Sequence, residues 1–285
     1  MPAFASAVKT SFDRRDWGPL VSPAVRRHKH LAGPANDASG AGMMAGPLKL
    51  TGIAAGGAAT AAFVHLLPGV VAWRASRCLA FPRLSGVGSA GHVALTFDDG
   101  PDPVSTPRIL DVLDELGWHA TFFCLGCQVR RSPGLARELV ERGHEVAVHG
   151  DDHRSHLLRS PRATVTDVAR ARDCIEEVTR SEVRWFRPPY GGVALPSWLA
   201  GRNSGLQMVL WTTWGIDWRE DSTGESVAAN VERTFHRGAT VLLHDSDITS
   251  ASQSWKSTVD ALPRLAERWA DAGLAVGPLR DHGIG

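Results

Sequence analysis

Short apolar runs alternate with longer amphipathic stretches from His92 to the end of the chain, and this alternation limits the possible folds more than any other feature. The apolar runs, which we expect to be strands, span 92–97, 119–125, 144–148, 183–186, 206–212, 239–243 and 274–279. The stretches with helical periodicity span 105–116, 132–142, 160–178, 195–202, 225–237 and 254–272. A strand–helix–strand repeat of this kind predicts a parallel sheet.

Seven expected strands with no long interruption favour an α/β fold of the distorted (β/α)7 barrel type, with an open doubly wound sheet as the alternative. No glycine-rich phosphate-binding motif follows a strand, so nucleotide binding has no support. The 31 Lys and Arg are balanced by 30 Asp and Glu, and the resulting net charge of +1 argues against a nucleic-acid partner.

The part of the chain before the first expected strand changes composition twice. Residues 1–46 are rich in Ala, Gly, Ser, Pro and Arg, so we expect them to be disordered or to be an extension outside the native protein. The second interpretation follows from Met43 and Met44, either of which is a candidate for the true start of translation. Residues 77–91 are expected to link this region to a domain of residues 92–285.

Residues 47–76 are expected to form an apolar signal or anchor helix. The stretch 50–73 contains no Asp, Glu, Lys or Arg and is long enough to cross a bilayer, which takes about 20 apolar residues. Basic residues precede it, which favours an N-terminus inside and a domain outside the membrane. The protein would then be extracytoplasmic, either secreted or membrane-anchored. A soluble helix packed on a domain that stays in the cytoplasm is the alternative.

Four cysteines are too few and too scattered for a disulfide framework. Cys124 and Cys127 form a C-x-x-C motif, which can indicate a redox pair or half of a zinc site. No second C-x-x-C follows, so a pair of buried or edge cysteines is favoured. A local disulfide between the two stays open if the domain is exported.

Charged and imidazole side chains follow five of the expected strands. Because the carboxyl ends of parallel strands share one rim of the sheet, we expect these side chains to gather there. They are Asp98 and Asp99 after the first strand, His149 and His153 after the third, Arg187 and Tyr190 after the fourth, Asp217 after the fifth and His244 after the sixth. Any one of them could be a loop residue facing water, but five such strand ends at one rim indicate a site.

A divalent metal ion would suit this rim. His149 and His153 are four residues apart, and with one carboxylate they give three protein ligands and an open position, as in catalytic zinc sites. Two surface histidines would be the simpler interpretation of that pair alone. A bound cation would also offset the repulsion between Asp98 and Asp99, because one could bind it while the other stays free as a base. A calcium loop is disfavoured, since histidines are poor calcium ligands.

Five motifs in order, "TFDDGPDP", "HGDDH", "RPPYGG", "WGID" and "LLHD", resemble those of the polysaccharide deacetylase family, the NodB-homology carbohydrate esterases of family 4. The resemblance covers residues 92–244 and implies a distorted barrel of seven strands. It also implies a metal-dependent hydrolase that removes N-acetyl groups from the amino sugars of a polysaccharide, such as peptidoglycan or a chitin-like glycan.

The resemblance also implies roles for individual residues. Asp99, His149 and His153 would bind the metal, which we expect to be Zn²⁺, although Co²⁺, Mn²⁺ or Ni²⁺ also suit these ligands. Asp98 would be the general base and His244 the general acid.

Other residues of the motifs would support this machinery. Arg187 would hold the base in place, and Asp217 would orient the acid. Tyr190 would bind substrate by donating its backbone N–H to the oxyanion, and Leu242 would line the pocket for the acetyl methyl group.

The sequence departs from the family pattern after the first metal histidine. Gly150 stands where the family usually has Ser or Thr, so a hydroxyl that braces the loop is missing. His156 is an additional histidine just beyond the motif, and we interpret it as a loop or packing residue and not as a fourth ligand.

A second departure concerns aromatic side chains. An acidic pair at 220–221 stands where the family often has an amide or acid followed by Trp. We expect Trp218 to bind sugar by stacking in its place and leave Trp214 open, whereas Trp185 and Trp211 are expected in the core.

Two alternative functions remain open from the sequence. One is a deacylase of a lipid-linked sugar or small amide on the same fold, and the other is a non-catalytic glycan-binding relative. Both proton-transfer groups and all three ligands are present, which argues against the second alternative. Neither the glycan nor the oligomeric state can be predicted from the sequence.

Overall fold

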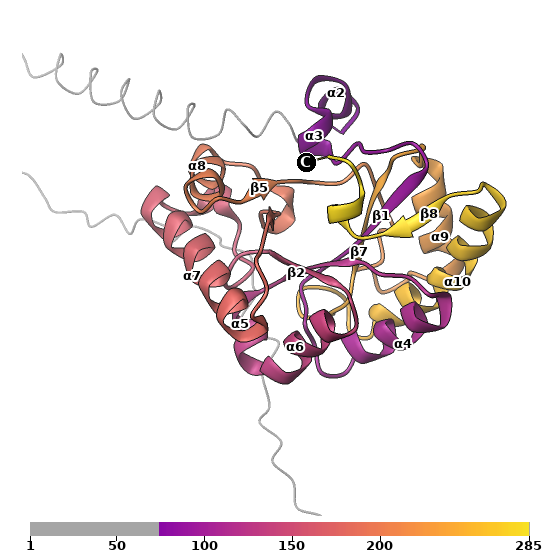
Figure 1. The fold of residues 1–285 in the computed structure, drawn as a ribbon, viewed down its shortest axis with the longest axis horizontal. Helices are drawn as coiled ribbons and strands as arrows, with labels where there is room; N and C mark the ends of the chain where they lie inside the picture. The colour runs from indigo at the N-terminus through magenta and orange to yellow at the C-terminus, as the bar shows by residue number, and fades with distance from the viewer. Residues whose placement is uncertain (1–73, 285) are drawn as a thin grey trace, which may run out of the picture. The chain divides into compact units, whose positions relative to one another are not determined.

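The strands of the computed structural model, which describes residues 74–284, are parallel and form one sheet (Figure 1). They are β1 (His92–Asp98), β2 (Thr121–Cys124), β3 (Glu145–Val148), β4 (Trp185–Phe186), β5 (Gln207–Met208), β6 (Thr213–Trp214), β7 (Thr240–His244) and β8 (Ala275–Gly277). Their order is β5-β4-β3-β2-β1-β7-β6, and β8 pairs with the start of β1. The expected parallel fold of the (β/α)7 type is therefore confirmed.

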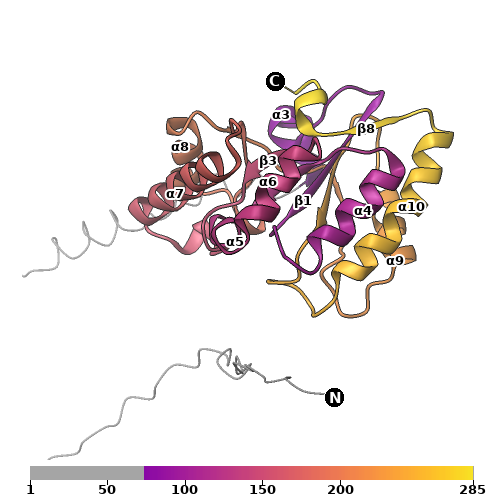
Figure 2. The ribbon, with the colours of Figure 1, turned by 60° about the horizontal axis from the view of Figure 1, so that its bottom comes forward.

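Helices connect the strands and cover the outer side of the sheet (Figures 1 and 2). The helices are α2 (Arg74–Ala80), α3 (Pro82–Ser85), α4 (Thr106–Leu116), α5 (Gly126–Arg131), α6 (Pro133–Glu141), α7 (Pro161–Thr179), α8 (Leu195–Asn203), α9 (Gly224–Arg233) and α10 (Trp255–Asp271). Six of them lie where the periodicity predicts a helix, and Ser160 caps α7 by accepting a hydrogen bond from the Ala163 N–H at 3.3 Å. The short helix α5 lies between the expected elements, where the periodicity predicts no helix.

One expected strand, 206–212, is paired only at residues 207–208, which form β5, and the next strand, β6, begins just beyond it at residue 213. β5 pairs with β4 and β6 pairs with β7, so a single extended segment runs from one edge of the sheet to the other. Between β5 and β6 the carbonyl groups of Val209 and Leu210 accept hydrogen bonds from the Arg187 guanidinium, at 3.4 and 2.7 Å. These carbonyls are therefore turned toward a buried side chain and do not pair with a neighbouring strand.

The hydrophobic core lies between the sheet and its helices. β1 is hydrogen-bonded to β2, β7 and β8, and its side chains Leu95 and Phe97 are fully buried. The Phe97 ring stacks on Phe122 with ring centroids 5.0 Å apart. A strand buried on both faces is typical of parallel sheets. Its final residue, Asp98, therefore emerges at the rim from a strand that is paired on both sides and buried.

The residues before β1 pack against the domain. Arg77 donates a hydrogen bond to the Trp211 carbonyl at 2.7 Å, and Leu84 contacts Val193 and Leu210 in a small buried cluster. The boundary between the expected linker and the domain stays a prediction.

The predictions for 1–46 and for the apolar stretch 50–73 fall outside the described residues. Within residues 74–284, none of the helices combines the length and the hydropathy that crossing a bilayer requires.

Candidate active site

A cavity of about 280 Å³ opens at the carboxyl ends of the strands. Seven residues singled out in the sequence line it: Asp98, His149, His153, Tyr190, Trp218, Leu242 and His244. Three others, Asp99, Arg187 and Asp217, are buried and contact these lining residues from behind. The structure thus brings all the predicted site residues to one rim.

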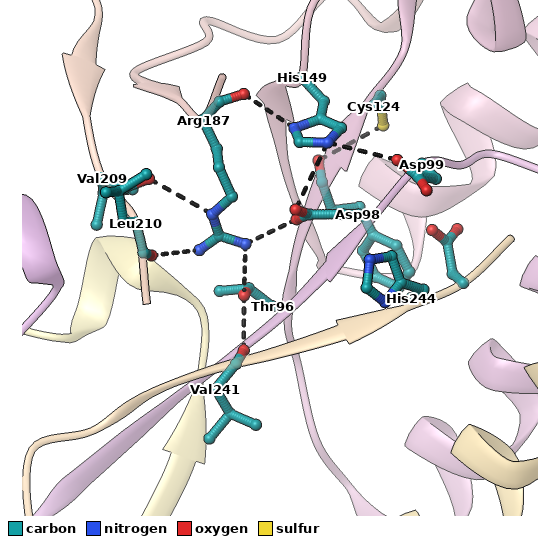
Figure 3. A network of polar contacts seen from close by, with 12 residues as sticks. Thr96, Asp98, Asp99, Cys124, His149, Arg187, Val209, Leu210, Val241 and His244 are labelled. Atoms are coloured by element: carbon teal, nitrogen blue, oxygen red, sulfur yellow. Dashed lines mark hydrogen bonds and ion pairs between the residues drawn. The ribbon is translucent and has the colours of Figure 1, made fainter. Parts of the chain in front are cut away.

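Asp98 is held by a buried arginine. Its Oδ1 lies 2.7 Å from Arg187 Nη1, and the same nitrogen donates to Thr96 Oγ1 at 2.9 Å (Figure 3). The guanidinium also lies over the Phe123 ring, 3.9 Å from its centroid. Arg187 is fully buried, so the packing around it fixes the directions in which its N–H groups donate. The carboxylate of Asp98 is therefore presented to the cavity in a defined orientation.

Three side chains beside Asp98 form a compact set of metal-binding type. One ligand atom each from Asp99, His149 and His153 lies within 4.8 Å of the other two. Asp99 Oδ1 is 3.4 Å from His149 Nε2 and 3.2 Å from His153 Nε2, and it has no hydrogen-bond partner although it is buried. A buried carboxylate oxygen without a donor is costly unless a cation binds there.

The geometry of this cluster fits a tetrahedral ion. Two donors bound about 2.1 Å from a tetrahedral zinc lie about 3.4 Å apart, close to the two separations around Asp99 Oδ1. His149 Nδ1 donates to the Arg187 carbonyl at 2.9 Å, which leaves the lone pair of Nε2 for a ligand (Figure 3). The residues present therefore fit a divalent cation with an open fourth position.

The protonation of the cluster also suits a cation. Burial raises the pKa of Asp99, but the neighbouring His149 and His153 imidazoles outweigh it and hold the pKa well below its usual range. Burial lowers the pKa of His149, but the charges of Asp98 and Asp99 in turn outweigh it and raise the pKa of this imidazole, whose proton a bound cation would displace. Burial lowers the pKa of His153 to about 4 against the opposing charge of Asp99. An ionised carboxylate and a neutral imidazole are the forms that bind metal.

His244 stands across the cavity at the end of β7. Its Nδ1 is 2.8 Å from Asp217 Oδ1, and Asp217 Oδ2 accepts from the His244 backbone N–H and from Thr258 Oγ1, both at 2.7 Å. Burial lowers the pKa of His244, but the Asp217 carboxylate outweighs this and raises the pKa to about 10. The imidazole is therefore protonated at neutral pH, as a proton donor must be.

An aromatic wall flanks His244. Trp218 meets the His244 ring edge-on with centroids 5.6 Å apart, and Trp214 lies next in the row, with Trp211 stacked beyond it. The expectation that Trp211 belongs to the core is wrong, since it is only half-buried and lines the cavity. Trp185, by contrast, is buried in the core as expected. Sequence periodicity could not distinguish Trp185 from Trp211, because each lies within a short apolar run.

Tyr190 closes the opposite side of the cavity. Its ring lies 4.4 Å from the His153 ring, and its side chain is 66% exposed. Its φ of 59° is in the left-handed region, which is strained for a tyrosine. Such strain at a cavity-lining residue is typical of functional positions.

The loop that carries His149 and His153 is braced by α7. Gly150 has a φ of 93°, and a Cβ there would lie 2.8 Å from Asp167 Oδ2. The same carboxylate contacts His156 Nε2 at 3.0 Å and Arg159. His156 is fully buried and stands apart from the metal-binding cluster.

Two residues of the site received no role from the sequence, although one of them, Asp245, ends the "LLHD" motif. Thr249, in the loop after β7, donates its hydroxyl to Asp99 Oδ2 at 2.5 Å and lines the cavity. Asp245 accepts from the Gly100 N–H at 3.0 Å and from Thr106 Oγ1 at 2.6 Å, which ties the turn after β1 to the end of β7. Burial raises the pKa of Asp245 to about 7.

The cysteines lie outside this machinery. Cys124 and Cys127 are free thiols in the structure, the first at the end of β2 and the second in α5. Burial raises the pKa of the Cys124 thiol well above its usual value, which makes it unreactive.

Comparison with known proteins places this geometry in a family. A family model described as polysaccharide deacetylase matches residues 86–209. A peptidoglycan-N-acetylglucosamine deacetylase of Bacillus cereus is 33% identical over 62% of this chain and 82% of its own length. A chitooligosaccharide deacetylase of Sinorhizobium fredii is 36% identical over 68% of this chain and 92% of its own. A solved pseudoenzyme of carbohydrate esterase family 4 from Bacillus anthracis has a TM-score of 0.62 and 26% identity over 68% of this chain and 66% of its own.

The matched region contains the strand ends that carry the cluster. Residues 86–209 include β1 with Asp98 and Asp99 and the loop after β3 with both histidines. The two curated relatives are matched over most of their length. This chain therefore belongs to the polysaccharide deacetylase family.

Proposed function

We propose that the protein is a metal-dependent deacetylase that removes N-acetyl groups from the amino sugars of a cell-wall polysaccharide, either peptidoglycan or a chitin-like glycan. The observation that carries this proposal is that Asp98 lines one cavity with His149, His153 and His244 and lies 3.6 Å from His149 Nε2 through its Oδ2. A base, a ligand set and an acid on one small cavity are the groups that amide hydrolysis needs.

Asp99, His149 and His153 would hold the cation, and Zn²⁺ suits two imidazoles and one carboxylate best, although Co²⁺, Mn²⁺ or Ni²⁺ also fit. When bound, such an ion lowers the pKa of a water molecule and polarises the amide carbonyl.

Asp98 takes a proton from the attacking water molecule while the water oxygen bonds to the carbonyl carbon. Arg187 holds the Asp98 carboxylate through Oδ1, which leaves Oδ2 for the proton. Tyr190 lines the cavity, and its backbone N–H would stabilise the oxyanion that develops on the carbonyl oxygen.

His244 gives its proton to the nitrogen as the carbon–nitrogen bond breaks, so an amine leaves and not an amide anion. Asp217 holds the imidazole by Nδ1 and keeps it protonated until that step. The products are acetate and a free amino sugar. Leu242, which is 3% exposed, provides an apolar wall for the acetyl methyl group, and Trp218 provides a face for the sugar ring.

The names of the relatives support a site of action outside the cytoplasm, at the cell wall. Secretion or membrane anchoring through 50–73 stays a prediction, because those residues are outside the described part of the chain.

Acetate release tests this function directly. The purified protein is incubated with N-acetylglucosamine oligomers and with peptidoglycan, before and after treatment with a chelator, and then with Zn²⁺ or Co²⁺ added back. We expect acetate from at least one glycan, loss of release with the chelator and recovery with the metal. A protein that binds these glycans but releases no acetate under any metal would be a non-catalytic relative, as the similar pseudoenzyme shows can occur in this family.

A further inference from the structure

We propose that Thr249 is a positioning residue that orients Asp99 so that only one of its carboxylate oxygens binds the cation. Thr249 lies in the loop between β7 and α10, outside every motif that the sequence offers. The inference rests on the proposed function, because it concerns the same metal-binding cluster.

The two oxygens of Asp99 have different surroundings. Oδ2 accepts the Thr249 hydroxyl at 2.5 Å, and among the described residues no other hydroxyl donates to this carboxylate. Oδ1 has no hydrogen-bond partner and lies 3.4 and 3.2 Å from the Nε2 atoms of His149 and His153. The hydroxyl therefore occupies one oxygen and leaves the other for a ligand.

This hydrogen bond limits how the carboxylate can bind. A free carboxylate rotates about its last bond and can present either oxygen, or both, to a cation. A donor fixed on Oδ2 holds the rotation and favours binding through Oδ1 alone. Partners of this kind contribute substantially to metal affinity, and their loss typically costs about 10-fold to 100-fold.

The loop that carries Thr249 is hydrogen-bonded to the segment beside Asp217, which is the partner of the proposed acid His244. The Ala251 N–H donates to the Trp218 carbonyl at 3.0 Å, and Trp218 directly follows Asp217 in the chain. Within the loop the Ile248 N–H donates to Ser246 Oγ at 3.2 Å. The loop that carries Thr249 is thus tied to the segment that carries Asp217, the partner of His244, and this contact helps to hold the Thr249 hydroxyl next to Asp99.

Substitution of Thr249 separates this role from a structural one. Thr249 is exposed in its loop, so we expect Thr249→Val, which keeps the shape and removes the hydroxyl, to fold normally. Thr249→Ser restores the hydroxyl, and Ser250→Ala is a matched control, since Ser250 lines the same cavity without contacting Asp99. Each metal-free protein is titrated with Co²⁺ and Zn²⁺ against a chromophoric chelator, and the visible spectrum of the Co²⁺ form is recorded.

We expect Thr249→Val to weaken metal affinity about 10-fold to 100-fold and to change the Co²⁺ spectrum, as a carboxylate that binds through both oxygens would. Thr249→Ser and Ser250→Ala should stay within about threefold of the wild type, and circular dichroism should show the same folded structure for all the metal-free proteins. Unchanged affinity and spectrum in Thr249→Val, with a wild type that binds metal, would overturn this role alone. A wild-type protein that binds neither ion would overturn the proposed metal site and this inference with it.

Discussion

Asp98 and Asp99 are neighbours in the chain, yet their carboxylates have different partners. Asp98 is paired with Arg187 at 2.7 Å, whereas Asp99 faces two imidazoles and the Thr249 hydroxyl. Two ionised carboxylates in one small site repel each other unless each has its own cationic or donor partner. The structure supplies a separate partner to each, so both can stay ionised for different tasks.

The Arg187–Asp98 pair predicts a large stability effect. Arg187→Met should lower the free energy of unfolding by about 3–5 kcal/mol, because it leaves the buried carboxylate without its partner. The double variant with Asp98→Asn should be less destabilised than the single variant, since the unpaired charge is gone. Urea denaturation of the three proteins measures this, and equal destabilisation of the single and double variants would contradict it.

Asp217 is expected to set the alkaline limit of activity through the pKa of His244. The Asp217 charge favours protonated His244, so Asp217→Asn should lower the His244 pKa from about 10. Because the acid works only while protonated, the falling alkaline limb of the kcat/KM profile should move to lower pH by one unit or more, as the approximate rule for losing a close charge implies. An alkaline limb at the same pH in both proteins would mean that His244 is not the acid.

At the scale of elements, the loop after β3 depends on Gly150. Gly150→Ala should lower the free energy of unfolding by about 1–3 kcal/mol, because the φ of 93° is strained for alanine and the new Cβ meets Asp167. Gly117, with a φ of 66° and open space around it, is a matched control in which only the backbone strain applies. Chemical denaturation compares the two variants. A Gly117→Ala protein as destabilised as Gly150→Ala would show that the Asp167 contact contributes nothing.

The elements also show what the sequence can predict. Apolar runs and helix signals place the long helices and the buried strands, because those elements depend on local periodicity. The segment 206–212 has the pattern of one strand, yet only residues 207–208 pair as a strand, because the buried Arg187 just after β4 takes the carbonyl groups of the two residues that follow. Such competition comes from a residue about twenty positions away, and no local pattern contains it.

The same distinction applies to the site. Motif residues at strand ends can be predicted, because the parallel fold brings those ends together. The roles of Thr249 and of Asp245, although the latter ends a motif, could not be predicted, since each acts through a contact with the turn after β1 that only the tertiary structure creates. Trp211 was assigned to the core for a similar reason, because an apolar residue beside a strand can face either side.

At the scale of the whole molecule, the C-terminal turn is docked on β1 by two histidines. His92 Nδ1 lies 2.9 Å from His282 Nδ1, and His282 is fully buried. Burial lowers the pKa of both, and that of His282 falls from 6.5 to about 4. In this contact at most one of the facing nitrogens can carry a proton, so a charged pair is excluded.

This contact makes stability depend on pH. His282 takes up a proton below pH about 6.5 in the unfolded chain, but only below pH about 4 in the folded protein. The free energy of unfolding should therefore fall as the pH drops through this range. The slope from His282 alone reaches about 1.4 kcal/mol per pH unit, and His282→Gln should reduce it by about that amount. Urea denaturation between pH 7 and 4.5 checks this. If the slope of the free energy of unfolding against pH is the same in the variant, His282 does not cause this pH dependence.

We propose that Asp99 binds the cation while Asp98, beside it, takes the proton. Asp98→Asn tests it most directly, because asparagine keeps the shape and can still accept the hydrogen bond from Arg187. Metal content and acetate release are measured on the same preparation. We predict a metal content equal to that of the wild type and acetate release lower by about 10²-fold to 10⁴-fold, the usual contribution of a general base. Full metal content with undiminished acetate release would exclude Asp98 as the general base.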